Sequence, residues 1–226
     1  MMLRIPQVLN EQQLGEFRQI LLQARWMDGR ATAGHQAVQV KDNLQLPVDL
    51  PEAKSLGQVI LHALERNPVF VSAALPKRIL APRFNCYQGG QSYGLHVDNA
   101  VSGEAGGERI RTDLSATLFL TAPQEYEGGE LLVEDTYGSH SVKLPAGDLI
   151  LYPASSLHQV MPVTRGARIA AFFWIQSMVR DDGERTLLFQ LDSSAQQLTR
   201  EQGAGSAVAT QLGGIYHNLL RRWAEV

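Results

Sequence analysis

Residues 77–177 consist of short apolar stretches interrupted by glycine and proline, and this pattern constrains the fold more than any other feature of the chain. The interruptions include Gly89-Gly90 and Gly128-Gly129. Many short strands separated by turn-forming residues are typical of a β-sandwich or barrel. We expect strands at residues 79–88, 94–97, 114–120, 130–134, 138–144, 148–152, 158–160 and 168–175.

Helical patterns flank this strand-rich region on both sides. Asn10, followed three residues later by Gln13, indicates a helix N-terminus with a capping box. A second helix is expected over residues 51–66 and should end before Pro68. Two further amphipathic stripes follow residue 183, with a break at 203–206 between them. We therefore expect an α+β protein with a mainly β core, divided into an N-terminal lead-in, a strand-rich domain and a C-terminal helical extension at residues 1–76, 77–178 and 179–226.

Composition excludes several classes of function. A formal net charge of −3 and a pI near 6.1 leave no basic footprint for nucleic acid. No apolar run is long enough to cross a bilayer, and the N-terminus lacks the apolar core of a signal peptide. A single cysteine, Cys86, excludes an internal disulfide and favours a reducing compartment. These features predict a cytoplasmic protein.

Three polar residues indicate a metal site. His96 and Asp98 are two residues apart, so on a strand they would point to the same face. His158 lies at the far end of the predicted strand set. Two imidazoles and one carboxylate that leave other positions open form the facial triad of non-haem Fe(II) oxygenases. We therefore predict that these three residues bind Fe(II).

The same residues allow structural roles as well. The His-x-Asp pair could lie in a surface turn, and His158 could be a core histidine that bonds to the backbone. The remaining histidines lack a comparable context, although His140 is a rival because it lies on a predicted strand. These remaining histidines are His35, His62, His140 and His217.

Arg168 indicates what binds beside the metal. It lies on an apolar strand, where a buried guanidinium needs a carboxylate or phosphate partner. A dicarboxylate that also binds the metal would provide one, and 2-oxoglutarate is such a ligand. Period two places Arg168, Ala170, Phe172 and Trp174 on one face, which would line the barrel interior. The alternative is an arginine at the barrel mouth whose head reaches water.

Several nearby residues are weaker candidates. Tyr87 or Tyr93 could donate a hydrogen bond to the co-substrate, and the alternative for both is aromatic packing within the strands. Gly128-Gly129 is expected to serve the fold as a turn. We expect Arg111 and Asp113 to have a structural role, although they could contact a substrate.

Six stretches that include these residues resemble a known family. They are residues 84–90, 93–99, 111–120, 128–131, 158–168 and 173–177. Together they resemble the bacterial PKHD-type hydroxylases, which belong to the prolyl 4-hydroxylase superfamily of Fe(II)/2-oxoglutarate dioxygenases. The resemblance extends over essentially the full chain, including the C-terminal helices.

The resemblance implies a double-stranded β-helix, or jelly roll, with N-terminal supporting helices and a C-terminal helical pair. It implies that His96, Asp98 and His158 bind Fe(II), that Arg168 binds the distal carboxylate of 2-oxoglutarate, and that ascorbate is the reductant. It also suggests a link to iron uptake or homeostasis. Phe119 departs from the superfamily pattern, which often has a tyrosine that contacts the co-substrate. Tyr87 or Thr117 could replace that hydroxyl.

We therefore expect a dioxygenase that uses O2 and 2-oxoglutarate to hydroxylate an unidentified small molecule or peptide. A non-catalytic sensor of iron or 2-oxoglutarate could use the same barrel. A zinc-binding cupin that acts as a hydrolase or isomerase is a third class. The apolar stripes of the C-terminal helices are too extensive for isolated helices in water, which makes a homodimer through these helices plausible.

Overall fold

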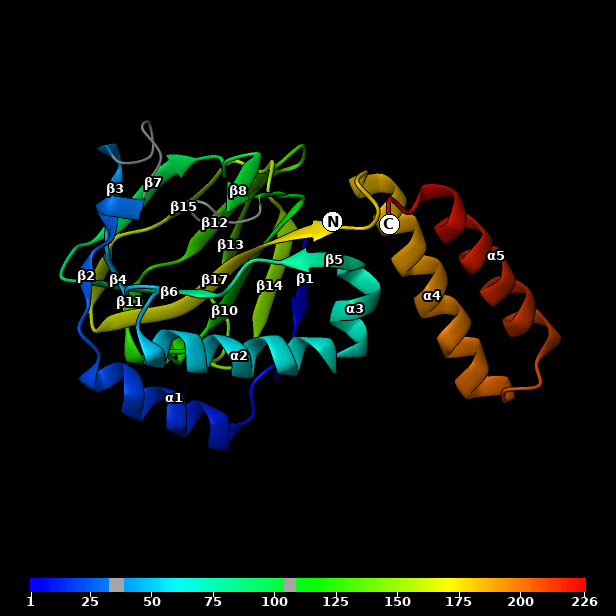
Figure 1. Cartoon of the computed structure of the whole chain (residues 1–226), viewed down its shortest axis with the longest axis horizontal. Helices are drawn as coiled ribbons and strands as arrows, with labels where there is room; N and C mark the ends of the chain where they lie inside the picture. Colours follow the sequence, from blue (N-terminus) through cyan, green and yellow to red (C-terminus); the bar gives the residue numbers. More distant parts are fainter. Residues whose placement is uncertain (33–38, 104–108) are drawn as a thin grey trace.

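The computed structural model describes residues 1–32, 39–103 and 109–226. Two antiparallel β-sheets face each other, helices cover the outer face of the larger sheet, and a pair of helices projects to one side (Figure 1). This is the jelly-roll architecture expected from the sequence, with helices at both ends of the chain.

The larger sheet has the strand order β1-β14-β10-β17-β6-β4-β2, and β5 also pairs with β17. Its members are β1 (Leu3–Ile5), β2 (Met27–Asp28), β4 (Leu44–Gln45), β5 (Pro76–Ile79), β6 (Arg83–Gln88), β10 (Leu114–Phe119), β14 (Leu149–Pro153) and β17 (Ala167–Ser177). The long strand β17 lies at its centre, and its register places Arg168 opposite Tyr87 of β6.

The smaller sheet has the order β13-β12-β15-β7-β3. Its members are β3 (Lys41–Asp42), β7 (Ser92–His96), β12 (Leu131–Asp135), β13 (Gly138–Val142) and β15 (His158–Val160). Two short pairs, β8 (Val101–Gly103) with β9 (Arg109–Arg111) and β11 (Glu127–Gly128) with β16 (Val163–Arg165), complete the described strands. Buried side chains such as Phe119, Leu131 and Val163 form the core between the sheets.

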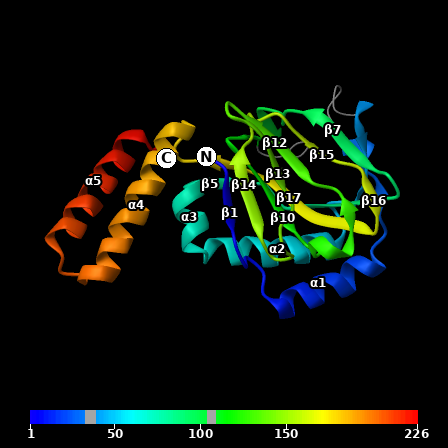
Figure 2. The same cartoon turned by 180° about the vertical axis from the view of Figure 1, so that it is seen from behind.

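The N-terminal helices pack against the outer face of the larger sheet (Figure 2). Helix α1 (Glu11–Gln23) begins at the predicted capping box: the Asn10 side chain accepts from the Gln13 amide, and the Gln13 side chain accepts from the Asn10 amide. Phe17 of α1 and Leu56 of α2 (Pro51–Glu65) share one core with Phe173 of β17. Alternation along β17 then turns Arg168 toward the space between the sheets.

The structure adds to the prediction at two prolines. The strand expected at 79–88 is interrupted, because Pro82 separates β5 from β6 and has no amide hydrogen to donate to a ladder. Helix α2 ends before Pro68, as predicted, but Pro68 also starts a further helix that was not predicted, α3 (Pro68–Ala74), with Asn67 as its N-cap. Proline is favoured at the first helical position because the amide there needs no partner within the helix. The prediction also missed the short strands β1, β8, β9, β11 and β16.

The C-terminal helices form an arm beside the barrel (Figure 1). Helix α4 (Asp182–Gln202) and helix α5 (Ala207–Trp223) are separated by the predicted break, and Asp181 caps α4. Leu188 packs with Leu75 and Val179 where the arm meets the barrel, and Trp223 lies against the same cluster. Within the described part of the chain, no helix is both long and apolar enough to span a membrane.

Candidate metal and co-substrate site

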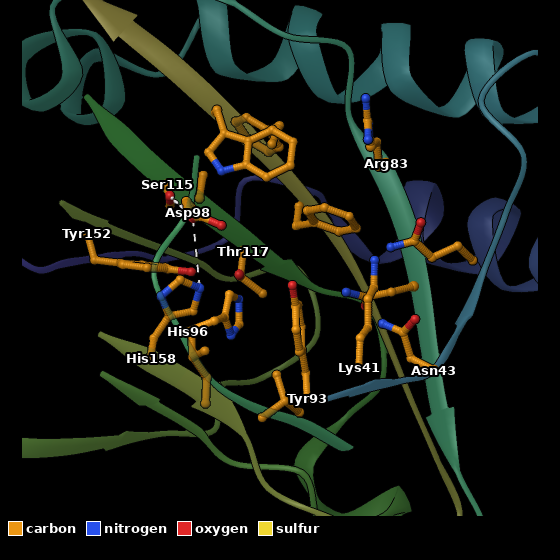
Figure 3. A pocket seen from close by; sticks show the side chains of 18 of the residues that line it. Lys41, Asn43, Arg83, Tyr93, His96, Asp98, Ser115, Thr117, Tyr152 and His158 are labelled. Atoms are coloured by element: carbon orange, nitrogen blue, oxygen red, sulfur yellow. Dashed lines mark hydrogen bonds and ion pairs between the residues drawn. The ribbon is translucent and has the colours of Figure 1, made fainter. Parts of the chain in front are cut away.

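The three residues predicted to bind a metal come together in a pocket between the two sheets. His96 ends β7 and His158 begins β15, and the antiparallel register places them directly opposite each other. One ligand atom from each of His96, Asp98 and His158 lies within 4.8 Å of the others. Figure 3 shows the three side chains converging at one end of this pocket.

Asp98 reaches this cluster in a different way from the one predicted. Strand β7 ends at His96, so strand alternation does not orient Asp98. Instead, Ser115 of β10 donates a hydrogen bond of 2.6 Å to Oδ2 of Asp98. The same oxygen lies 3.8 Å from Nε2 of His158. Strand β10 of the larger sheet therefore holds the carboxylate in place.

Backbone contacts orient both imidazoles. Nδ1 of His96 lies 2.8 Å from the carbonyl oxygen of Gly94, and Nδ1 of His158 lies 3.0 Å from that of Ser156. Because a carbonyl only accepts, each Nδ1 carries the proton in the neutral ring and each Nε2 is left with a lone pair. This is the tautomer that a metal ligand needs.

The surroundings keep His96 neutral. Burial, followed by the charge of His158, lowers the pKa of His96 from 6.5 to about 4. The Tyr93 ring stacks on His96 with a centroid distance of 3.6 Å and an interplanar angle of 17°. Tyr152 packs edge-on against His158 at 5.3 Å. Neutral imidazoles are the form that binds metal ions.

Arg168 is one of the most deeply buried side chains, with 1% of its surface exposed. Its guanidinium lies 5.6 Å from the ring of Tyr87 and 5.1 Å from that of Phe119. Among the described residues, none of its three guanidinium nitrogens has a hydrogen-bond partner. A buried cation with open donors costs free energy unless an anion binds it. Arg168, Phe172 and Trp174, three of the four residues predicted to share the interior face, line the pocket, and Phe173 lines it as well.

Gly129 makes room for Arg168. Its φ angle is +69°, and a Cβ atom there would lie 3.0 Å from both Cδ of Arg168 and Cε2 of Tyr126. The glycine pair therefore shapes the site as well as the turn. The Tyr126 hydroxyl is also buried without a hydrogen-bond partner in the described structure.

The structure also places the weaker candidates. His140 on β13 bonds to Asp135 at 2.8 Å and does not belong to the cluster, and His35 lies outside the described residues. Arg111 forms a two-bond pair with Asp113, which also accepts the Ser177 amide, in line with a structural role. Tyr87, Tyr93 and Thr117 line the pocket.

The polar pocket residues that were not predicted include Lys41, Asn43, Gln45 and Asn85. Three of them belong to the segment around β3 and β4, whose strands are two residues long. Strands this short have no detectable periodicity in the sequence. The sequence therefore contained no signal for this part of the site.

The site as a whole offers two imidazoles and one carboxylate together with an unpaired buried guanidinium. Such a ligand set suits Fe(II) and leaves coordination positions for other ligands. The guanidinium suits a planar carboxylate, which it can bind with two parallel hydrogen bonds. An iron ion and a dicarboxylate thus fit the residues present.

Sequence comparisons agree with this chemistry. Residues 82–176 match the 2OG-Fe(II) oxygenase superfamily, which defines the class of enzyme. Residues 182–225 match the PKHD-type hydroxylase C-terminal domain. The chain is 58% identical over 226 residues to PKHD-type hydroxylase Smlt1146 of Stenotrophomonas maltophilia (strain K279a), and the match covers 100% of both proteins. The chain belongs to the PKHD-type hydroxylases, a family of Fe(II)- and 2-oxoglutarate-dependent oxygenases.

Solved structures show the same fold. A prolyl-4-hydroxylase of Pseudomonas putida superposes with a TM-score of 0.52 at 17% identity, covering 78% of this chain and 92% of that one. HygX of Streptomyces hygroscopicus, with nickel and 2-oxoglutarate bound, gives a TM-score of 0.51 at 15% identity, covering 76% and 81%. These likenesses support the jelly-roll assignment.

Proposed function

We propose that this enzyme holds Fe(II) through His96, Asp98 and His158, and the distal carboxylate of 2-oxoglutarate through Arg168. One observation carries the proposal: an open cluster of three ligands shares a pocket with a buried guanidinium that has no partner in the described structure. The cluster alone could bind any of several metals, and the guanidinium alone could bind any carboxylate or phosphate. Together they match a metal-chelating dicarboxylate.

Each residue has a distinct role in this proposal. The Gly94 and Ser156 carbonyls fix the histidine tautomers, and Ser115 orients Asp98. Arg168 fixes the direction of 2-oxoglutarate, and its planar fork suits a carboxylate better than a lysine does. When bound, the iron and 2-oxoglutarate activate O2, so that a substrate C–H bond is hydroxylated while succinate and CO2 are released.

We propose that Tyr87 donates a hydrogen bond to 2-oxoglutarate and replaces the hydroxyl missing at Phe119. Tyr87 lines the pocket beside Arg168. Burial raises the pKa of Tyr87 to about 12, so its hydroxyl keeps its proton and can donate. Tyr126 and Thr117 are the alternatives, because the Tyr126 hydroxyl is buried without a hydrogen-bond partner in the described structure and Thr117 lines the pocket.

Succinate production tests the proposed activity. The full chain is incubated in air with Fe(II), 2-oxoglutarate and candidate substrates. We expect succinate to form and O2 to be consumed, and both should stop in Asp98→Ala. A non-catalytic sensor would bind 2-oxoglutarate without forming succinate. A zinc cupin would contain zinc after anaerobic purification, and Fe(II) would not restore its activity.

Two further assignments follow from the family resemblance. We propose ascorbate as the reductant that keeps the iron in its Fe(II) state. Its omission should shorten the linear phase of succinate formation, and an unchanged progress curve would contradict this role. We also propose a link to iron uptake, which predicts that cells lacking the protein grow more slowly than wild type only under iron limitation.

We propose that the arm formed by α4 and α5 supports a homodimer. Leu187, Val208 and Ile215 are 56%, 52% and 43% exposed on it, although their positions continue the apolar stripes. Deletion after Arg180 should lower the oligomeric mass or cause aggregation, as measured by light scattering. A truncated chain with unchanged stability and subunit count would contradict this proposal.

A further inference from the structure

A cluster of buried polar side chains lies in the same pocket as the metal ligands but takes no part in the chemistry proposed above. Lys41 and Asn43 lie on the opposite side of Tyr93 from His96 and His158 (Figure 3). Asn85 on β6 is directly opposite Gln45 on β4. We call these four residues, Lys41, Asn43, Gln45 and Asn85, the polar wall.

The wall is buried and leaves amide groups without partners. Asn43 is 1% exposed and Asn85 is 7% exposed. In the described structure, Oδ1 of Asn85 has no hydrogen-bond partner. The side chain of Asn43 makes no hydrogen bond of good geometry either, although it interacts with the neighbouring Tyr87 hydroxyl. Each such group costs free energy if it stays unpaired. Amides that served only the fold would be expected to bond to one another, so their free atoms indicate a ligand.

Positive charge accompanies these amides. Lys41 is 5% exposed, and its Nζ lies 5.5 Å from the Tyr93 ring. Arg83, also in the pocket wall, lies 5.6 Å from the Trp174 ring. Burial lowers the pKa of Lys41 to about 8, which still leaves most of it protonated at neutral pH. This end of the pocket therefore favours an anion.

We propose that the polar wall binds the primary substrate, and that this substrate is a small anionic molecule with a carboxylate and a neighbouring amide, as in an N-acylated amino acid. The carboxylate would face Lys41 and Arg83. Nδ2 of Asn43 can donate to the amide carbonyl, and Oδ1 of Asn85 can accept from the amide N–H, so each wall residue takes one end of the trans amide. Tyr93 lies between this site and the histidines, and both line the same pocket, so the substrate would share that pocket with the metal ligands.

This inference rests on the proposed function, because 2-oxoglutarate is the main competing occupant of the wall. In that proposal, one carboxylate and the keto oxygen of 2-oxoglutarate face the metal, and the other carboxylate faces Arg168. No polar group of the co-substrate is left for Asn43 or Asn85. A different molecule must satisfy these amides.

Probe binding tests the proposal on the full chain loaded with Mn(II) and 2-oxoglutarate under anaerobic conditions. Three probes are compared by saturation-transfer NMR: N-acetyl-L-alanine, its neutral carboxamide and butanoate. We expect N-acetyl-L-alanine to bind at least about fivefold more tightly than either of the others, because only it offers both charge and amide. Asn43→Leu and Asn85→Leu should each weaken it at least about tenfold, the effect of losing one or two buried hydrogen bonds.

The 2-oxoglutarate affinity of each variant, measured by calorimetry, separates the possible failures. The affinity for 2-oxoglutarate should stay within about twofold of wild type in Asn43→Leu and Asn85→Leu. The control variant Asn218→Leu, on the exposed face of α5, should change neither the 2-oxoglutarate affinity nor the N-acetyl-L-alanine affinity. Weaker 2-oxoglutarate binding in Asn43→Leu would assign the wall to the co-substrate and overturn the inference. The inference would also be overturned if wild type binds 2-oxoglutarate but binds all three probes equally. The same holds if wild type binds 2-oxoglutarate and none of the probes.

Absence of 2-oxoglutarate binding to wild type would instead refute the proposed function. If Asn43→Leu fails to fold by circular dichroism, Asn43→Asp keeps the shape and adds a negative charge. This variant should lose N-acetyl-L-alanine binding through repulsion of its carboxylate. Wild-type binding by Asn43→Asp would contradict the proposed wall.

Discussion

Arg168→Lys should weaken 2-oxoglutarate binding much more than metal binding. Lysine keeps the charge but replaces the planar fork by a single ammonium group. Because all three guanidinium nitrogens lack partners in the described structure, the ligand carboxylate can take two of them. Losing one charge-assisted hydrogen bond costs about 1.5–3 kcal/mol, which corresponds to roughly a 10- to 150-fold rise in Kd.

Calorimetric titration of 2-oxoglutarate into the Mn(II)-loaded chain measures this change, and a separate Mn(II) titration measures the metal affinity. Arg165→Lys on β16 is a matched control, because Arg165 is exposed and pairs with Glu127 at the surface. We expect the control to bind both ligands like wild type. If Arg168→Lys loses metal and 2-oxoglutarate affinity equally, then Arg168 supports the fold of the site and does not bind the co-substrate.

Two further predictions concern other pocket residues. Tyr87→Phe should raise the Kd for 2-oxoglutarate about tenfold, because one hydrogen bond is lost, whereas Tyr126→Phe should leave this Kd unchanged. If the same calorimetric assay gives the opposite ranking, Tyr126 is the residue that donates to 2-oxoglutarate. Burial lowers the pKa of Lys41 from 10.5 to about 8, so between these pH values the unfolded chain binds more protons and stability rises with pH. Lys41→Met should remove this rise, which amounts to roughly 3 kcal/mol in denaturant unfolding. A variant whose stability rises with pH as the wild type does would show that Lys41 is not the group responsible.

The sequence predicted the part of the site that lies on regular strands. Alternation along β17 predicted that Arg168 faces the interior, where it lines the pocket. The capping box at Asn10 was also predicted, because it depends on residues three positions apart. These features depend on local periodicity, which a single sequence contains.

The rest depends on long-range contacts. Asp98 is oriented by Ser115, which is 17 residues away in the sequence. Tyr126 and the stem of Arg168 both pack close to Gly129, where a side chain would crowd them. Asn43 enters the pocket from a segment of two-residue strands whose position is fixed by pairing with β6 and β7. No local pattern encodes such contacts.

Anaerobic titration with Fe(II) and 2-oxoglutarate tests the central claim most directly. A metal held by His96, Asp98 and His158, with 2-oxoglutarate bound to it, should give a visible charge-transfer band. We expect this band in wild type and in His140→Ala, and its loss in His158→Ala while circular dichroism stays unchanged. A band that persists in His158→Ala but disappears in His140→Ala would contradict the assignment of the metal ligands.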